Sequence, residues 1–374
     1  CALPICDVFG NGMLLSPRIK LVAAFDHRDI FIDPDPDTAE SLAERRRLFG
    51  LPRSSWRDFE TSVISEGGGV YSRAAKEIVL SQQARAALGV EMERATPQEV
   101  IRAILRAPVD LLWFGGIGAY VRAADESDDQ VGDRANDGLR VTADELRCKA
   151  IGEGANLGVT QRGRIAAGAR GIRLNSDAID NSAGVNTSDI EVNLKIALAE
   201  PVRSGALELE ARNELLAQMT NDVAALVLRN NYQQTLCLSL AERRGAEDVP
   251  HAIALMRALE RKGKLDCKVE FLTEDPAFEA RARAGRGLTR PELSTLLAYA
   301  KLDMHEALLA SNVPDDPFLS RELVRYFPRA VVERFPEAVA RHRLRREIVT
   351  TGLVNAIVNR GGPTVLARID AATG

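Results

Sequence analysis

The stretch Val109–Phe114 (VDLLWF), followed by Gly115-Gly116, decides the fold predicted for the first half of the chain. Short apolar runs of this kind are typical of strands that are buried on both faces of a parallel sheet. Three similar runs are Lys20–Phe25 (KLVAAF), Cys148–Ile151 (CKAI) and Ile172–Leu174. Capping boxes that begin at Thr96 and Thr142 predict helix starts between these runs. Strands that alternate with helices predict an α/β domain with a parallel sheet.

The pattern of apolar residues changes at about Glu191, where strand-like runs are replaced by helical periodicity. Apolar residues then recur at spacings of three and four and predict one apolar helical stripe: Leu215, Leu216, Met219, Val223, Leu226 and Val227. A third capping box, Thr289-Arg-Pro-Glu292, opens another predicted helix. We therefore place a domain boundary between Ile190 and about Ala211, and predict an α/β domain over residues 1–190 and an all-α region over residues 191–374.

Composition excludes several classes of protein. Of the 374 residues, 45% are hydrophobic and 27% are charged, which is typical of a globular protein, and the net charge of -4 argues against a nucleic-acid binder. Glutamates interrupt the arginine-rich stretch 321–346, which favours a solvated helical face over a nucleic-acid site. No apolar run approaches the roughly 18 residues of a membrane helix. The five cysteines and four histidines lack metal spacing, so we expect no metal and a cytoplasmic protein with reduced thiols.

The start of the chain carries a candidate phosphate site, Gly10-Asn11-Gly12, just before the KLVAAF run. A glycine turn that leads into a helix presents free backbone amides to a pyrophosphate. Asp26 ends the KLVAAF run, where a dinucleotide-binding fold places an acid against the adenosine ribose. Such a carboxylate repels the extra phosphate of NADP and so favours NAD, although His27 and Arg28 follow directly and a nearby cation could accept that phosphate.

Two asparagines follow later predicted strands. Asn156 lies in Gly152-Glu-Gly-Ala-Asn156, and Asn181 lies in Asp180-Asn-Ser-Ala-Gly-Val185. Ligands of open α/β sheets bind beyond the carboxyl ends of the strands, and each asparagine amide offers one acceptor oxygen and an amino donor group. These groups suit a nicotinamide carboxamide or a ribose, while both asparagines can also serve simply as turn formers.

These motifs resemble those of the large bacterial NAD-specific glutamate dehydrogenases. The resemblance rests on stretches along nearly the whole chain: DVFGNGMLLS, LVAAFDHRDIFIDPDPD, LPRSSW, ISEGGGV, PVDLLWFGGIG, GDRAND, DAIDNSAGV, NNYQQTL and LTRPELSTLLAYAK. It implies a Rossmann-like NAD-binding domain followed by a helical tail. It also implies a homo-oligomer that oxidatively deaminates L-glutamate to 2-oxoglutarate and ammonia.

The resemblance assigns roles at matched positions. Gly10, Asn11 and Gly12 would meet the pyrophosphate, Asp26 the adenosine ribose, and Asn156 and Asn181 the nicotinamide ribose and amide. Val185 and Ser188 would face the substrate, with the serine hydroxyl reaching its distal carboxylate.

Two departures concern the cofactor site. Cys6 stands where the family has a glycine, and Phe114 where it usually has an asparagine. No stretch matches the family's loop with the catalytic lysine, and the family's lysine and aspartate are expected upstream of a truncated Cys1. We therefore assign no catalytic residue to the chain, and expect it to be inactive alone.

Three other interpretations remain open on the sequence. The chain could be the NAD-binding module of another oxidoreductase, a dinucleotide-binding domain without catalysis, or a partner-binding protein. The tail segments Tyr232–Leu236 and Thr289–Lys301 are interpreted as core or interface rather than as catalytic.

Overall fold

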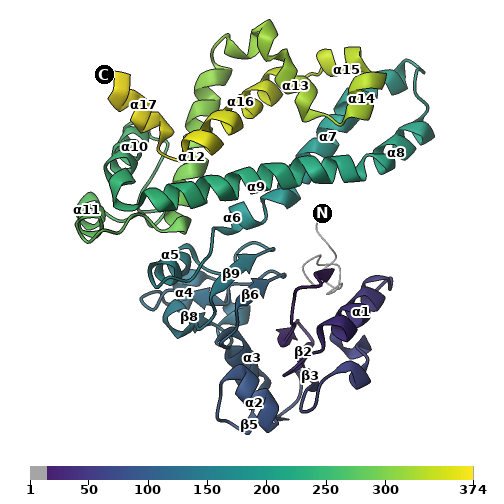
Figure 1. Ribbon diagram of the computed structural model, residues 1–374, viewed down its shortest axis with the longest axis vertical. Coiled ribbons are helices and arrows are strands. Elements are labelled where there is room, and N and C mark those ends of the chain that lie inside the picture. Colours follow the sequence, from purple (N-terminus) through teal and green to yellow (C-terminus); the bar gives the residue numbers. More distant parts are fainter. Residues whose placement is uncertain (1–14, 374) are drawn as a thin grey trace. The chain divides into compact units, whose positions relative to one another are not determined.

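The computed structural model describes residues 15–373 and divides the chain into two compact units, with the sequence boundary between Asp177 and Ala178. The first is a mixed α/β unit and the second is built from helices and loops (Figure 1). The predicted boundary at 190 falls inside α7 (Ser182–Arg203), a single helix that the contacts group with the helical unit.

The α/β unit contains an antiparallel sheet of three strands in the order β1-β2-β3, and two parallel pairs, β6-β9 and β7-β8. Its described strands are β1 (Ala23–Phe25), β2 (Asp29–Ile32), β3 (Gly69–Ser72), β4 (Ile78–Val79), β5 (Arg94–Ala95), β6 (Leu111–Phe114), β7 (Val121–Arg122), β8 (Val141–Thr142) and β9 (Ala150–Glu153). Its helices are α1 (Thr38–Phe49), α2 (Gln82–Leu88), α3 (Pro97–Leu105), α4 (Asp128–Val131) and α5 (Gln161–Ala169).

The KLVAAF run is not a strand of the parallel sheet, and this prediction was wrong. Its last residues form β1, which pairs antiparallel with β2. The reason is local: the Asp26 N–H donates to the carbonyl of Asp29 at 3.0 Å, and Asp26 Oδ1 accepts from the backbone amides of Arg28 and Asp29, each at 2.7 Å. These bonds close a tight turn, so the chain reverses at once instead of entering a crossover helix.

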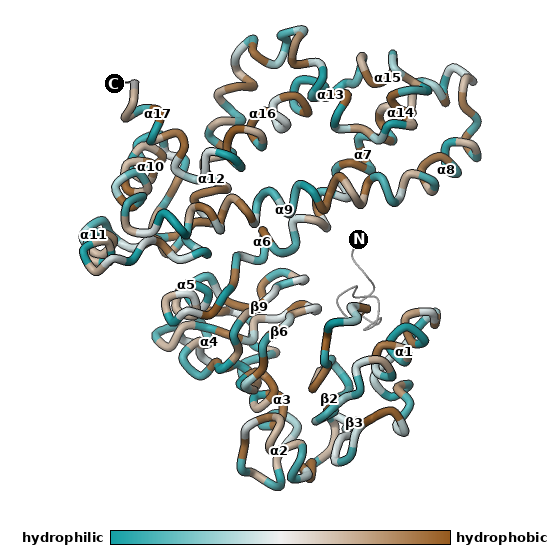
Figure 2. Tube along the Cα trace, viewed as in Figure 1, coloured by the Kyte–Doolittle hydropathy of each residue, from teal (hydrophilic) through white to brown (hydrophobic). Residues whose placement is uncertain are grey.

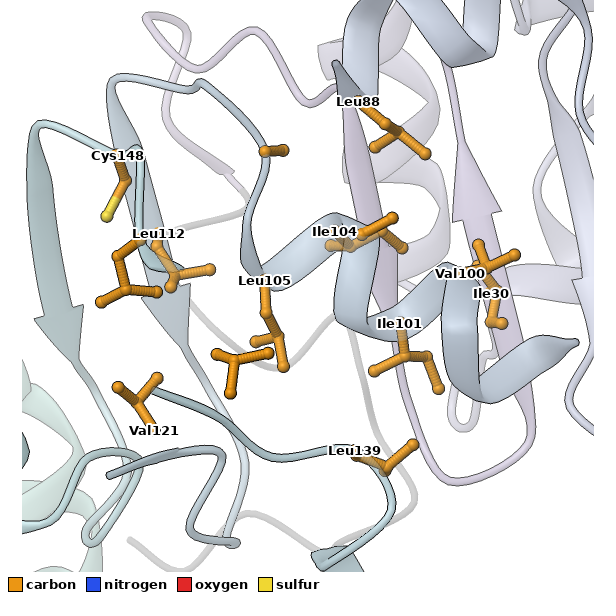
Figure 3. Packing of buried hydrophobic residues seen from close by; sticks show 14 of the residues in the cluster. Ile30, Leu88, Val100, Ile101, Ile104, Leu105, Leu112, Val121, Leu139 and Cys148 are labelled. Carbon is orange, nitrogen blue, oxygen red and sulfur yellow. The ribbon is translucent and has the colours of Figure 1, made fainter. Parts of the chain in front are cut away.

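Two of the other three runs form parallel strands as predicted, and the third, Ile172–Leu174, forms no strand. β6 and β9 pair in parallel with Leu111 opposite Ala150 and Phe114 opposite Glu153. The run at Ile172–Leu174 supplies a parallel bridge from Arg173 to Ala150, on β9. Helix α3 packs against both sheets, because Val100 lies beside Ile30 of β2 while Leu105 points toward β6 (Figure 3). The core of the α/β unit therefore joins the antiparallel and parallel strands through one amphipathic helix.

The capping boxes were confirmed to different extents. Thr96 and Glu99 cap α3 reciprocally, and Thr289 and Glu292 cap α12 (Arg290–Leu309). The box at Thr142 opens only a 3-10 helix of three residues, Ala143–Glu145.

The helical unit has two apolar clusters that the long helix α9 (Thr220–Arg244) connects. Val227 of α9 belongs to one cluster and Leu238 to the other, and hydrophobic and hydrophilic segments alternate along this helix (Figure 2). The predicted stripe is split at Met219, where α8 ends and α9 begins. The remaining described helices are α6 (Asp177–Asp180), α8 (Leu209–Gln218), α10 (Val249–Arg261), α11 (Asp275–Arg283), α13 (Ser320–Tyr326), α14 (Arg329–Arg334), α15 (Pro336–Ala340), α16 (Arg345–Gly361) and α17 (Val365–Thr373).

Candidate functional site

The carboxyl ends of β6 and β9 lie side by side, and glycine-containing loops leave both of them. The Ala155 N–H donates to the Phe114 carbonyl at 3.1 Å, so the loop after β9 begins against the end of β6. Asn156 follows and is exposed. The structure thus places this predicted residue at the carboxyl edge of the parallel strands, where α/β sheets bind ligands.

The glycines beside Asn156 have a packing role that the sequence did not reveal. A Cβ atom on Gly152 would lie 2.5 Å from the Trp113 ring, and one on Gly154 would lie 2.3 Å from it. The indole of Trp113 therefore lies directly against the backbone of β9 and its loop. Its Nε1 is buried and has no hydrogen-bond partner in the described part of the chain.

A buried ion network holds the Asn156 loop. Arg164 of α5 donates to both carboxylate oxygens of Glu153, at 2.7 and 2.9 Å, and its NH2 group lies 3.0 Å from Asp177 Oδ2. The same two acids accept from the loop backbone: Val159 N donates to Glu153 at 3.1 Å and Leu157 N donates to Asp177 at 3.0 Å.

This network buries a carboxylate and fixes the backbone conformation of the loop. Only 1% of the Glu153 side chain is exposed, so burial raises the pKa of its carboxyl group, and the hydrogen bonds from Arg164 oppose that shift. The backbone bonds hold Leu157 at a φ of 68°, a left-handed conformation that is unusual for leucine. Charge pairing thus fixes the shape of the loop.

A row of three aromatic rings connects the residue before Asp26 with the carboxyl end of β6. The ring of Phe25, the preceding residue, meets Tyr120 edge-on at 5.5 Å, and Tyr120 stacks on Phe114 at 6.0 Å. One oxygen of Asp26 closes the β1–β2 turn, and the other, Oδ2, is buried without a hydrogen-bond partner among residues 15–373. The turn explains why an aspartate suits this position, and it leaves one oxygen uncommitted.

Phe114 belongs to the core rather than to the loop. Its side chain is 5% exposed and packs against Tyr120 and Gly158, where an added Cβ would lie 2.6 Å from the phenylalanine ring. Its ring therefore does not lie in the turn that follows β6. The Gly10-Asn11-Gly12 motif and Cys6 lie outside the described residues.

The other predicted residues, Asn181, Val185 and Ser188, belong to the helical unit. Asn181 directly precedes α7, and its carbonyl accepts from the Gly184 N–H at 3.1 Å. Val185 is 64% exposed and Ser188 is also exposed. Their spacings of four and three residues place all three on one face of the start of α7.

Sequence reasoning missed a polar cluster at the same helix start. Asn231 and Gln234 of α9 donate to the hydroxyl oxygen of Ser182, at 2.8 and 3.4 Å, and Lys301 of α12 donates to Gln234 Oε1 at 3.1 Å. Burial lowers the pKa of Lys301 to about 8. NNYQQTL and AYAK carry three of these residues, but no local signal links them to Ser182, because the contacts cross 49–67 residues of sequence.

Among residues 15–373, no group of three or more histidine, cysteine or acidic residues could hold a metal ion. No helix in residues 15–373 combines the length and the apolar composition that crossing a membrane requires.

Two family models match the chain. The model described as bacterial NAD-glutamate dehydrogenase, catalytic domain, matches residues 5–241, and the model described as glutamate dehydrogenase, C-terminal, matches residues 285–374.

Several curated relatives are named NAD-specific glutamate dehydrogenase. The protein of Pseudomonas aeruginosa is 51% identical over 98% of this chain, that of Halomonas elongata 48% over 98%, and that of Mycobacterium tuberculosis 50% over 97%. The chain spans only 23% of the length of each of these relatives.

Proposed function

The chain belongs to the bacterial NAD-glutamate dehydrogenase family, and on this premise we propose that it supplies the NAD-binding part of such an enzyme. The reaction of the whole protein would be oxidative deamination of L-glutamate to 2-oxoglutarate and ammonia. The observation that carries the proposal within the structure is the paired carboxyl ends of β6 and β9, with Asn156 exposed beside them. We propose that these strands belong to a Rossmann-like sheet.

Polar atoms at this edge fit a dinucleotide. Trp113 Nε1 is a buried donor and Asp26 Oδ2 a buried acceptor, and neither has a hydrogen-bond partner in the described chain. A dinucleotide carries carbonyl oxygens that accept and ribose hydroxyls that donate. We assign Asp26 to the adenosine ribose, Asn156 and Asn181 to the nicotinamide side, and Gly10, Asn11 and Gly12 to the pyrophosphate.

The chain's own groups would bind and orient the reactants. When bound, NAD accepts the hydride that leaves the α-carbon of glutamate. The Glu153–Arg164–Asp177 network keeps the Asn156 loop rigid, which lowers the entropy lost on binding. Val185 and Ser188 would face the substrate. The proton-transfer lysine and aspartate that the family resemblance implies have no assigned position in this chain.

Calorimetric titration of the chain with NAD and NADP tests the proposal. We expect tighter binding of NAD, because the Asp26 carboxylate repels a 2′-phosphate, and no glutamate-dependent NADH production by the chain alone. Asp26→Asn keeps an oxygen acceptor for the β1–β2 turn but removes the charge, so it should narrow the difference between the two cofactors.

The matched control is Asp35→Asn, which removes an exposed carboxylate of the same unit that pairs with Lys20 at 2.6 Å. It should leave the preference for NAD unchanged. Failure of the unmodified chain to bind NAD would count against the proposed function. Equal affinities for NAD and NADP would count only against the role of Asp26.

We also propose a cytoplasmic, homo-oligomeric enzyme. Cys148, Cys237 and Cys267 are free thiols in the structure, as in proteins of reducing compartments. Analytical ultracentrifugation measures the oligomeric state.

A further inference from the structure

The polar cluster at the start of α7 has a hydrogen-bond direction that can be worked out. Two groups in it have only one possible polarity. Below its pKa of about 8, Lys301 carries an ammonium that can only donate, and the backbone carbonyl of Ile179 can only accept. Each of them contacts one of the two amide side chains that reach Ser182.

These two groups fix the orientation of both amides. Lys301 Nζ donates to Gln234, so the oxygen of that amide faces the lysine and its nitrogen faces Ser182 at 3.4 Å. Asn231 Nδ2 donates to the Ile179 carbonyl at 3.1 Å and to Ser182 Oγ at 2.8 Å. Reversing the Gln234 amide would place its amino group against the Lys301 ammonium, which is also a donor. Reversing the Asn231 amide would place its oxygen against the Ile179 carbonyl, which is also an acceptor.

The orientation of the two amides determines where the Ser182 hydroxyl can donate its proton. A serine oxygen has two lone pairs and one proton. Both lone pairs accept from the amides, so the proton has to be donated elsewhere, and the structure gives it no acceptor in residues 15–373. Ser182 is only partly buried, so this proton can reach a ligand.

We propose that Ser182 is a ligand-binding residue that donates its hydroxyl proton to the carboxamide oxygen of the nicotinamide. This inference deepens the proposed function and rests on it, since Ser182 adjoins Asn181, which we assign to the nicotinamide. Asn231, Gln234 and Lys301 are positioning residues that direct the hydroxyl outward. The positive end of the α7 dipole favours an acceptor oxygen at the same place.

The test uses the intact chain and two ligands, NAD and its thionicotinamide analogue, in which a weakly accepting sulfur replaces the carboxamide oxygen. We expect the unmodified chain to bind NAD about 3- to 10-fold more tightly than the analogue, the range for one neutral hydrogen bond. Ser182→Ala should bind both ligands alike, and Ser182→Thr, which keeps the hydroxyl, should restore the difference.

A second pair of variants tests the direction of the proton. In Gln234→Glu, a carboxylate that cannot donate faces Ser182. The Ser182 hydroxyl should then donate its proton to this carboxylate, so the proton is no longer available to the ligand. This variant should match Ser182→Ala, and the double variant should be no weaker than either single one. Gln233→Glu, the same charge change one residue earlier on α9, should bind as the unmodified chain does. Thermal melts monitored by circular dichroism confirm that each variant is folded.

The outcomes separate this inference from the function it rests on. If the unmodified chain does not bind NAD, the proposed function fails and the inference fails with it. If it binds NAD but Ser182→Ala preserves the preference for oxygen over sulfur, the inference alone is wrong. A loss seen only when 2-oxoglutarate is added with NADH would transfer the proton to a substrate carboxylate and overturn the carboxamide assignment. Additive losses in the double variant would overturn the positioning role of Gln234.

Discussion

The loop around Asn156 and the turn around Asn181 each carry an asparagine that we assign to the nicotinamide side, but the structure holds them by different means. Around Asn156, the buried charges of Glu153, Arg164 and Asp177 hold the backbone. Around Asn181, the neutral amides of α9 hold the neighbouring serine, and the cation Lys301 contacts one of these amides, Gln234.

This difference separates two physical tasks. Removing one partner of a buried ion pair costs about 3–5 kcal/mol because the other charge stays buried, so such a network is suited to fixing a shape. A neutral hydrogen bond contributes only about 0.5–1.5 kcal/mol, but it has a donor end and an acceptor end. The amide network is therefore suited to directing a proton. The following predictions test this contrast, from the largest expected effect to the smallest.

Arg164→Met should cause the largest loss of stability. It leaves the Glu153 carboxylate buried without its cation, and we expect the free energy of unfolding of the chain to fall by about 3–5 kcal/mol. Urea denaturation measures the loss. Arg162→Met is the control, because Arg162 lies on the same helix and pairs with the exposed Asp125, and it should cost less than about 1 kcal/mol. Equal losses for the two variants would refute the structural role of the buried network.

Gly154→Ala should destabilise the Asn156 loop by steric conflict. The added methyl group would lie 2.3 Å from the Trp113 ring, so the indole or the backbone has to move, at about 1–3 kcal/mol. Tryptophan fluorescence together with urea denaturation detects both changes. Gly116→Ala adds the same atom where nothing lies within 4 Å, and should have little effect. A tolerated Gly154→Ala would show that the indole does not need the glycine.

Lys301→Met should change the pH dependence of stability. Burial lowers the pKa of Lys301 from 10.5 to about 8, so the protonated form destabilises the fold, and stability rises as the lysine loses its proton between pH 8 and 10.5. The variant should lack this rise, which we expect to be about 1–2 kcal/mol after allowance for the partial exposure of the side chain. Denaturation curves at pH 7.5 and 10.5 measure the difference, and the exposed Lys195→Met should keep the full rise. An unaltered rise in Lys301→Met would contradict the lowered pKa.

Ser188→Ala should have the smallest effect on stability. The residue is exposed on α7, so the free energy of unfolding should change by less than about 0.5 kcal/mol. Its proposed task is to bind the distal carboxylate of the substrate, so 2-oxoglutarate affinity in the presence of NADH should fall while NAD affinity stays the same. A loss of stability comparable with that of Gly154→Ala would show that Ser188 serves the fold instead.

Local chemical signals predicted part of this fold. The capping boxes at Thr96 and Thr289 determine where α3 and α12 begin, because each box is complete within four residues. The apolar runs of β6 and β9 likewise predicted two strands of a parallel sheet and the glycine loops that follow them, and the structure pairs these two strands in parallel. The family motifs identified the family along nearly the whole chain.

The sequence by itself determined the family, the starts of α3 and α12, and two strands of the parallel arrangement, β6 and β9. These features depend on residues close together in the chain or on motifs shared with relatives. Only the tertiary structure decided that the end of KLVAAF pairs antiparallel, that Trp113 lies on Gly152 and Gly154, and that α9 contacts Ser182 while α12 contacts Gln234. The first depends on a turn whose bonds compete with a crossover, and the others on side chains that only the packing of separate elements brings within contact. No local pattern records such contacts, because their partners are chosen by the fold as a whole.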